Sequence, residues 1–279
     1  MELETIGTQS FAAIVTGAVL AVVIPIIVAV IWKVAKKERF TSILAGAATF
    51  LLFVFILEKP LQALVVSVDH PVSRFLTANP LLLAIVLGLF PGIFEETGRL
   101  VAYKTVLKNR RNRETAVSHG IGHGGCEVMI LLGMSYITYI SYAAMINSGT
   151  FATLIDQMPA QADTLYALAG QLAHLSFAGI IPGFAERLFA FLFHTGASII
   201  VFYACKDRKK LWLYPLAIVL HTALDFWAGL YSLKMINIPI AAFEAILALF
   251  GILVFAGAYI LLYRKDTDPE MKINHEKAH

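Results

Sequence analysis

Long apolar runs alternate with short polar segments along the whole chain. Each run is long enough for a helix to cross the roughly 30 Å of hydrocarbon in a bilayer. The pattern predicts seven membrane-spanning helices, over residues 10–32, 41–57, 80–107, 116–146, 183–204, 211–232 and 239–263. A further apolar helix is expected over residues 163–180, which gives an all-α transmembrane bundle of seven to eight helices.

The composition supports this assignment. Of the 279 residues, 58% are hydrophobic and 15% are charged, and the mean hydropathy is +0.74. Values this apolar exclude an ordinary soluble domain. We expect one integral membrane domain over residues 1–279, in a multi-pass protein of the cell membrane.

Lysine and arginine gather in four segments and predict the orientation. Of the 22 basic residues, 4, 5, 4 and 4 lie in residues 33–39, 104–114, 206–210 and 264–279. Because basic loops stay on the cytoplasmic side, we expect the N-terminus outside and a cytoplasmic tail at residues 264–279. If helices 163–180 and 183–204 both crossed, the basic segment 206–210 would lie outside. Residues 163–180 are therefore expected not to cross fully.

Ionisable side chains lie inside the predicted spans. Each costs at least about 2.5–3.5 kcal/mol at the bilayer centre, so such residues usually face a cavity lined by protein. With 1.5 Å of rise per residue, those on four spans fall about 10–21 Å from the cytoplasmic helix ends. They are Glu95, Arg99, His123, Glu127, His194, His221 and Asp225. This shared layer is our candidate site.

The segment FEETGR places two acids and a base within two helical turns. Glu95 and Arg99 are four residues apart and share one helix face, so the arginine can keep that carboxylate ionised. Glu96 points about 100° away, so the two glutamates can have separate roles. The alternative is a buried ion pair that only fixes helix packing.

The segment HGIGHGGCE forms a polar stripe of His119, His123 and Glu127, each four residues apart. Gly120 and Gly124 make a pair of small residues that lets another helix approach closely. That approach would bring a neighbouring helix within reach of His123. His119 lies nearest the interface, and either a site role or simple solvation fits its position.

Two later segments add further candidates. In HTALD, His221 and Asp225 share a helix face, so the carboxylate can orient the imidazole or help to bind a metal. Upstream, Glu186 and Arg187 lie near the outer end of the span that carries His194, where a structural or gating role is favoured over chemistry.

The motifs EExxR, HGxGHGGxE and HxxxD, with an ER pair and His194 between the last two, resemble the YhfC family of intramembrane proteases. This family is grouped with the type II CAAX prenyl proteases, the PrsW proteases and the anterior-pharynx-defective subunit of γ-secretase. The resemblance covers about residues 80–230. It implies a catalytic core at 80–232, with accessory spans in 10–79 and a final span at 239–263.

The resemblance also implies roles for single residues. Glu95 or Glu96 would activate a water, and we favour Glu95. His123 or His194 would position that water, and His221 would stabilise the oxyanion.

The chain departs from the CAAX pattern at two positions. CAAX proteases commonly have asparagine where this chain has Asp225, whose carboxylate cannot donate a hydrogen bond when ionised. Asp225 is expected either to orient His221 or to stay protonated. The arginine of the CAAX motif is usually one residue further along than Arg99. Both departures favour the YhfC branch.

The same side chains could bind zinc. Three of His123, His194, His221 and Glu127 would leave one coordination position open, as catalytic zinc sites do. Our metal candidates are His123, His194 and His221. We favour a mechanism that needs no metal, with zinc as the alternative.

The sequence therefore predicts an intramembrane endopeptidase, of glutamic or metalloprotease type, that hydrolyses a peptide bond in or near the membrane. Its expected partners are a membrane-embedded or membrane-proximal peptide and the lipid bilayer, with no nucleic acid. A proton- or solute-coupled transporter is one alternative, because intramembrane acids and histidines also form proton relays. A non-catalytic scaffold is another. The oligomeric state is left open.

Overall fold

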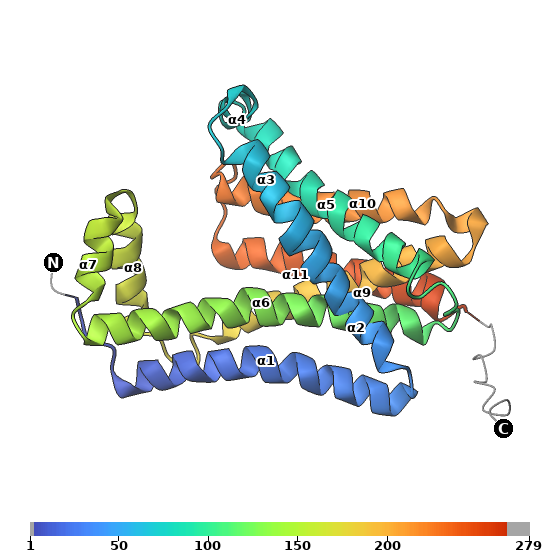
Figure 1. The fold of residues 1–279 in the computed structure, drawn as a ribbon, viewed down its shortest axis with the longest axis horizontal. Coiled ribbons are helices and arrows are strands. Elements are labelled where there is room, and N and C mark those ends of the chain that lie inside the picture. The colour runs from blue at the N-terminus through green and yellow to red at the C-terminus, as the bar shows by residue number, and fades with distance from the viewer. Residues whose placement is uncertain (1–2, 267–279) are drawn as a thin grey trace. The chain divides into compact units, whose positions relative to one another are not determined.

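The computed structural model describes residues 3–266, and every regular element in that range is helical (Figure 1). Seven helices are long and apolar enough to cross a membrane: Thr8–Lys36, Phe40–Val66, Pro80–Lys104, Glu114–Asn147, Ile181–Lys206, Arg208–Ser232 and Ile240–Tyr263. Each contains or overlaps one predicted span, so the polytopic helical fold is confirmed. Hydropathy alone locates these helices because each must cover its backbone polar groups in lipid.

The helices are bounded as follows. In chain order they are α1 (Thr8–Lys36), α2 (Phe40–Phe50), η1 (Leu51–Glu58), α3 (Lys59–Val66), α4 (Pro71–Thr77), α5 (Pro80–Lys104), α6 (Glu114–Asn147), α7 (Phe151–Gln157), η2 (Pro159–Gln161), α8 (Ala162–Ala173), α9 (Ile181–Lys206), η3 (Arg208–Lys210), α10 (Leu213–Ser232), α11 (Ile240–Ala258) and η4 (Tyr259–Tyr263).

The eighth apolar helix is shorter than expected. It appears as α8, which ends at Ala173, and a turn in which the Gly179 amide donates to the Ser176 carbonyl follows at 3.0 Å. Its 12 residues span about 18 Å, less than the hydrocarbon thickness. A helix of this length does not cross the membrane by itself, in agreement with the constraint from the basic residues.

The second span continues beyond the predicted end at residue 57. Figure 1 shows α2, η1 and α3 as one continuous rod. Its middle part, η1, is π-helical, and the Lys59 amide donates to the Val54 carbonyl five residues earlier. Pro60 follows at once and has no amide to donate. A local change to π-helical geometry lets the carbonyls that precede a proline accept hydrogen bonds from other backbone amides.

The chain forms two compact units. The larger unit holds Val28–Cys126 and residues 189–266. Its apolar core includes Tyr103, Phe193 and Phe202, all at most 4% exposed. Here α2 and α6 touch through glycine: a Cβ on Gly122 would lie 1.8 Å from the Ile43 carbonyl oxygen. Only a residue without a side chain permits this approach.

The smaller unit holds residues 3–27 and Glu127–Leu188. Its core packs Ile14, Phe151 and Leu165, and Figure 1 shows α7 and α8 as a short helical hairpin. The Asn147 side chain ties the start of the chain to the end of α6, because it accepts from the Ile6 amide at 2.7 Å and donates to the Ile6 carbonyl at 3.1 Å.

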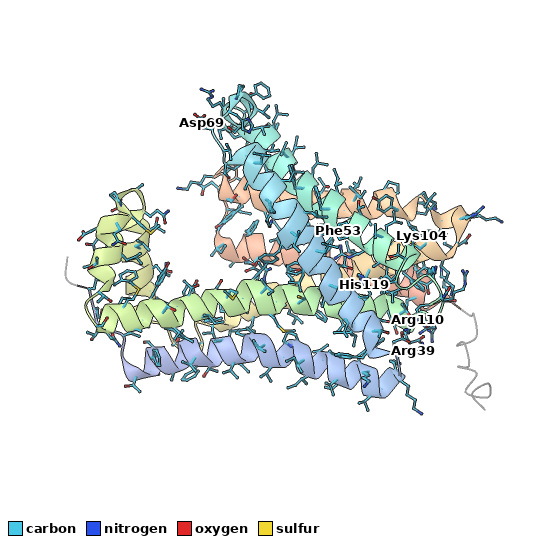
Figure 2. The ribbon with its side chains drawn as sticks, in the orientation of Figure 1. Arg39, Phe53, Asp69, Lys104, Arg110 and His119 are labelled. Carbon is cyan, nitrogen blue, oxygen red and sulfur yellow. The ribbon has the colours of Figure 1, made fainter. Side chains whose placement is uncertain are left out.

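At one end of the larger unit, the buried Glu38 carboxylate joins the turn before α2 to the loop before α6. Its carboxylate accepts hydrogen bonds from Ser42 (2.9 Å), Asn112 (2.5 Å), Thr115 (3.0 Å) and Arg110 (3.4 Å). Figure 2 labels Arg110 close to Arg39 at this end. The two connections are therefore held together by one carboxylate.

Candidate active site

Helix α5 carries a buried cluster of two acids and one base. Glu95, Glu96 and Arg99 are 6%, 0% and 0% exposed. Arg99 Nη1 donates to Glu96 Oε1 at 2.8 Å, whereas its Nη2 lies 3.7 Å from Glu95 Oε2. The sequence pattern pairs the arginine with Glu95, and the closer partner is Glu96. Residues three and four positions away both flank a helical side chain, and the guanidinium fork reaches both.

The same guanidinium reaches helix α9. Arg99 Nη2 lies 2.7 Å from His194 Nδ1, and Arg99 Nε donates to Ser198 Oγ at 3.3 Å. Arginine has only donors, so Nδ1 of His194 is the acceptor and carries no proton. Arg99 thus joins α5 to α9 through a neutral imidazole nitrogen and a hydroxyl.

Helix α10 brings His221 against both glutamates. Its Nδ1 lies 2.7 Å from Glu96 Oε1, and its Nε2 lies 3.3 Å from Asp225 Oδ2 and 3.9 Å from Glu95 Oε1. Asp225 therefore contacts the imidazole, as the shared helix face predicts. Its side chain is 34% exposed, whereas that of His221 is 3% exposed. This histidine can be oriented by an acid at each ring nitrogen.

Helix α6 adds His123, which is fully buried. Its Nε2 lies 2.8 Å from Glu95 Oε2, and its ring centre is 5.1 Å from that of His194. A Cβ on Gly120 would lie 2.6 Å from Thr195 Cα of α9, so the predicted close approach at this glycine is present. Among residues 3–266, no group bonds the buried Nδ1 of His123.

His119 lies behind this cluster, and Figure 2 labels it on α6 beside the rod of α2 and η1. It is completely buried, and its ring nitrogens lie 3.3 Å from Thr49 Oγ1 and 3.3 Å from Ser198 Oγ. Solvation, one of the two options left open for His119, is therefore wrong: α2 packs over the residue.

Glu127, the last member of the predicted layer, belongs to the smaller unit. There Arg187 Nη1 donates to Glu127 Oε1 at 3.0 Å, and its Nη2 is bonded to Glu186. Arg187 thus bridges two carboxylates, and the structural or gating role expected for the ER pair stays a prediction.

The contacts of two buried residues, Ser198 and Glu58, are not evident from the sequence. Ser198 joins Arg99 to His119, but a serine in a run of small residues gives no signal of such a contact. Glu58 is fully buried at the end of η1, Lys59 donates to its Oε1 at 2.9 Å, and its Oε2 has no partner among the described residues. An acid at the end of an apolar run is an available signal, but the predicted span stops one residue before it.

Three side chains of the cluster are arranged to accept a metal ion. Glu95, His194 and His221 each offer a ligand atom within 4.8 Å of the others. His194 and His221 are predicted ligands that recur here, and the third group is Glu95, whose Oε2 lies 2.8 Å from Nε2 of His123. Glu96 holds Nδ1 of His221, the outer-sphere arrangement typical of metal-bound histidine. Two imidazole nitrogens and one carboxylate oxygen are ligands that suit zinc.

Arg99 limits this fit at one atom. Its Nη2 occupies the lone pair of His194 Nδ1, the nitrogen that lies 3.6 Å from Glu95 Oε2. His194 is therefore a ligand through Nδ1 only when the guanidinium withdraws from it. The donor set fits a metal, and Arg99 is the group that would have to move.

Comparison with known proteins identifies the family of the chain. A family model described as YhfC intramembrane metalloprotease matches residues 20–248. The chain is 31% identical over 248 residues to the uncharacterized membrane protein YhfC of Bacillus subtilis (strain 168), which covers 89% of this chain and 95% of the relative. No solved structure matches.

Proposed function

Because the chain belongs to the YhfC family of intramembrane metalloproteases, we propose that it hydrolyses a peptide bond in or next to the membrane with a water activated at Glu95. Intramembrane proteolysis is the activity that the family description supports. The observation that carries the mechanism is the contact between Glu95 and three imidazoles, His123, His194 and His221, at 2.8, 3.6 and 3.9 Å.

Glu95 is the better base of the two glutamates. Oε1 of Glu96 already receives both Arg99 and His221, and Glu96 has no exposed surface. Glu95 is 6% exposed and lies between the imidazoles. A general base must come within hydrogen-bond reach of the water whose proton it takes. We assign Glu95 to that step and Glu96 to positioning His221 and Arg99.

The histidines have separate tasks in this proposal. His123 lies beside Oε2 of Glu95 and orients that carboxylate. His221, held by Glu96 and Asp225, donates a hydrogen bond to the oxyanion that forms when water attacks the peptide carbonyl. Asp225 is the most exposed of these groups, so water and substrate reach His221 from its side.

In a metal-dependent reaction, Glu95, His194 and His221 would hold the metal that the family description implies, and Glu95 and His221 would then serve as its ligands instead of as base and oxyanion donor. A bound zinc ion lowers the pKa of its water and polarises a carbonyl. The family description thus supports zinc, the alternative considered from the sequence, over a mechanism without metal.

The test uses the full chain, purified and placed in lipid nanodiscs, with a panel of single-span model peptides that carry a fluorophore and a quencher. Replacing Glu95 by Gln keeps the shape and removes the base, so we expect cleavage to fall about 10²–10⁴-fold. Glu4→Gln is the matched control, because Glu4 is 63% exposed and its one ion-pair partner among residues 3–266 is the exposed His174.

Zinc content is measured in the same preparations. We expect about one zinc per chain in the wild type, and its loss in His221→Ala but not in the control His174→Ala. Cleavage that survives Glu95→Gln would overturn the assignment of Glu95 as the base, and a wild type that cleaves no peptide of the panel would favour a transporter or a scaffold. A zinc-free wild type that still cleaves would establish the glutamic mechanism instead.

A further inference from the structure

The larger unit contains a polar cavity, formed where spans α9 and α11–η4 end. It has a volume of about 520 Å³, within the range of small-molecule sites. Five of its lining side chains are cationic: Arg111, Lys206, Arg208, Lys210 and Lys265. Two, Asp207 and Asp266, are anionic. The cavity therefore carries an excess of three positive charges.

Both acids of the cavity are already engaged. Asp266 Oδ2 accepts from Lys206 Nζ at 2.5 Å and from the Tyr203 hydroxyl at 2.6 Å. Asp207 caps η3, where its Oδ1 accepts from the Lys209 amide at 3.0 Å. These bonds fix the walls of the cavity, and its five cations outnumber the two acids.

Arg208 and Lys265 have no such partner. Both are exposed, and within residues 3–266 neither side chain forms an ion pair or a hydrogen bond. The Arg111 guanidinium donates through Nη2 to the Lys206 carbonyl at 3.0 Å, which fixes it at the rim. Cations held close together without counter-charge favour an anion with several acceptor oxygens, such as a phosphate ester.

The surroundings of the cavity indicate where that anion comes from. Lys206 and Tyr263 are the last residues of two candidate spans, so the cavity lies at the level of the lipid headgroups. Leu261 lines it and is 60% exposed on the adjoining span, where an acyl chain would lie. Basic pockets between transmembrane helices on the cytoplasmic side are typical sites for anionic lipid headgroups.

We propose that this cavity binds the phosphate headgroup of an anionic phospholipid, with Arg208 and Lys265 as the main cationic contacts. The inference is independent of the peptidase proposal, because none of the lining residues belongs to the buried cluster around Glu95. It gives the protein a lipid ligand as well as a peptide substrate.

The test is native mass spectrometry of the full chain in detergent with three probes: phosphatidylglycerol, phosphatidylcholine and soluble glycerol phosphate. We expect the wild type to retain phosphatidylglycerol at least about tenfold more tightly than phosphatidylcholine, and Arg208→Gln/Lys265→Gln to lose that preference. The control Lys36→Gln/Lys209→Gln removes two exposed cations outside the cavity and should keep it.

Three results would overturn the proposal. Equal retention of the two lipids excludes an anion site. Equal loss in both double variants shows a general charge effect. Glycerol phosphate that binds as tightly as the lipid makes a soluble phosphate ester the ligand. Circular dichroism of each variant confirms that the helices are intact, so a change in lipid retention reports on the cavity.

Discussion

Arg99 is the residue that holds the buried cluster together. Its three nitrogens contact Glu96, His194 and Ser198, on α5 and α9. A guanidinium with no exposed surface is stable only when its donors are used and its charge is matched. Arg99 is therefore a structural requirement for the cluster, whatever it adds to chemistry.

We expect Arg99→Ala to lower the free energy of unfolding by about 3–5 kcal/mol, because it leaves Glu96 as a buried, uncompensated carboxylate. The measurement is loss of helical circular dichroism during titration of micelles with sodium dodecyl sulfate. Arg74→Ala is the control: this arginine is 68% exposed and pairs with Asp69, so its loss should cost at most about 1 kcal/mol. Similar losses in the two variants would show that the Arg99 contacts are not stabilising.

The sequence predicts which residues enter the cluster but not how they pair. Spacing along one helix brings Arg99 near either glutamate, and the choice of Glu96 depends on His221 of α10, which contacts the same oxygen. The contacts of Ser198 are equally hard to predict from the sequence. Its role depends on the rotation of α9 against α5 and α6, which no local pattern contains.

At the scale of elements, the contact between α2 and α6 depends on glycine from both sides. A Cβ on Gly46 would lie 2.0 Å from the His119 carbonyl oxygen, and one on Gly122 would lie 1.8 Å from that of Ile43. Both clashes involve backbone atoms, so the helices themselves would have to separate. The same contact covers His119 and places Thr49 beside it.

Gly122→Ala should therefore destabilise the protein by about 1–3 kcal/mol or more, as overpacking does. Gly257→Ala is the matched control, because nothing lies within 4 Å of the added Cβ and alanine is the better helix former. We expect its stability to stay equal or to rise. Thermal unfolding of the two variants in the same detergent distinguishes them, and a stable Gly122→Ala protein would contradict the observed helix contact.

The spans themselves follow from hydropathy, because lipid requires a long apolar helix for each crossing. The π-helical η1 and the length of α3 do not, since both depend on how Pro60 is accommodated within a continuing helix. The apolar character of residues 163–180 does not indicate where the helix ends. In the structure, α8 ends at Ala173.

For the whole molecule, the orientation in the membrane stays a prediction from the basic segments. It requires the loops that carry Lys108 and Lys209 to be cytoplasmic, and those that carry Asp69 and Ser148 to face outward. All four side chains are exposed, so each position can be tested chemically.

Single cysteines at these four positions, in a chain with Cys126 and Cys205 replaced by Ala, provide the measurement. We expect a membrane-impermeant maleimide to label the Asp69 and Ser148 positions in intact cells, and the Lys108 and Lys209 positions only after permeabilisation. Labelling of Lys108 in intact cells would reverse the orientation. It would also place the cavity proposed to bind a phospholipid headgroup at the outer leaflet.

The four hydrogen bonds onto Glu38 limit where the chain can be cut or extended. A fluorescent fusion partner or an epitope tag inserted at residues 37–39 would part the helix ends that this carboxylate joins. The turn at Gly149 has a left-handed backbone, exposed neighbours and open space around it, and a tag there interrupts no comparable junction. Reporter insertions for tracking the protein in cells therefore belong at that turn.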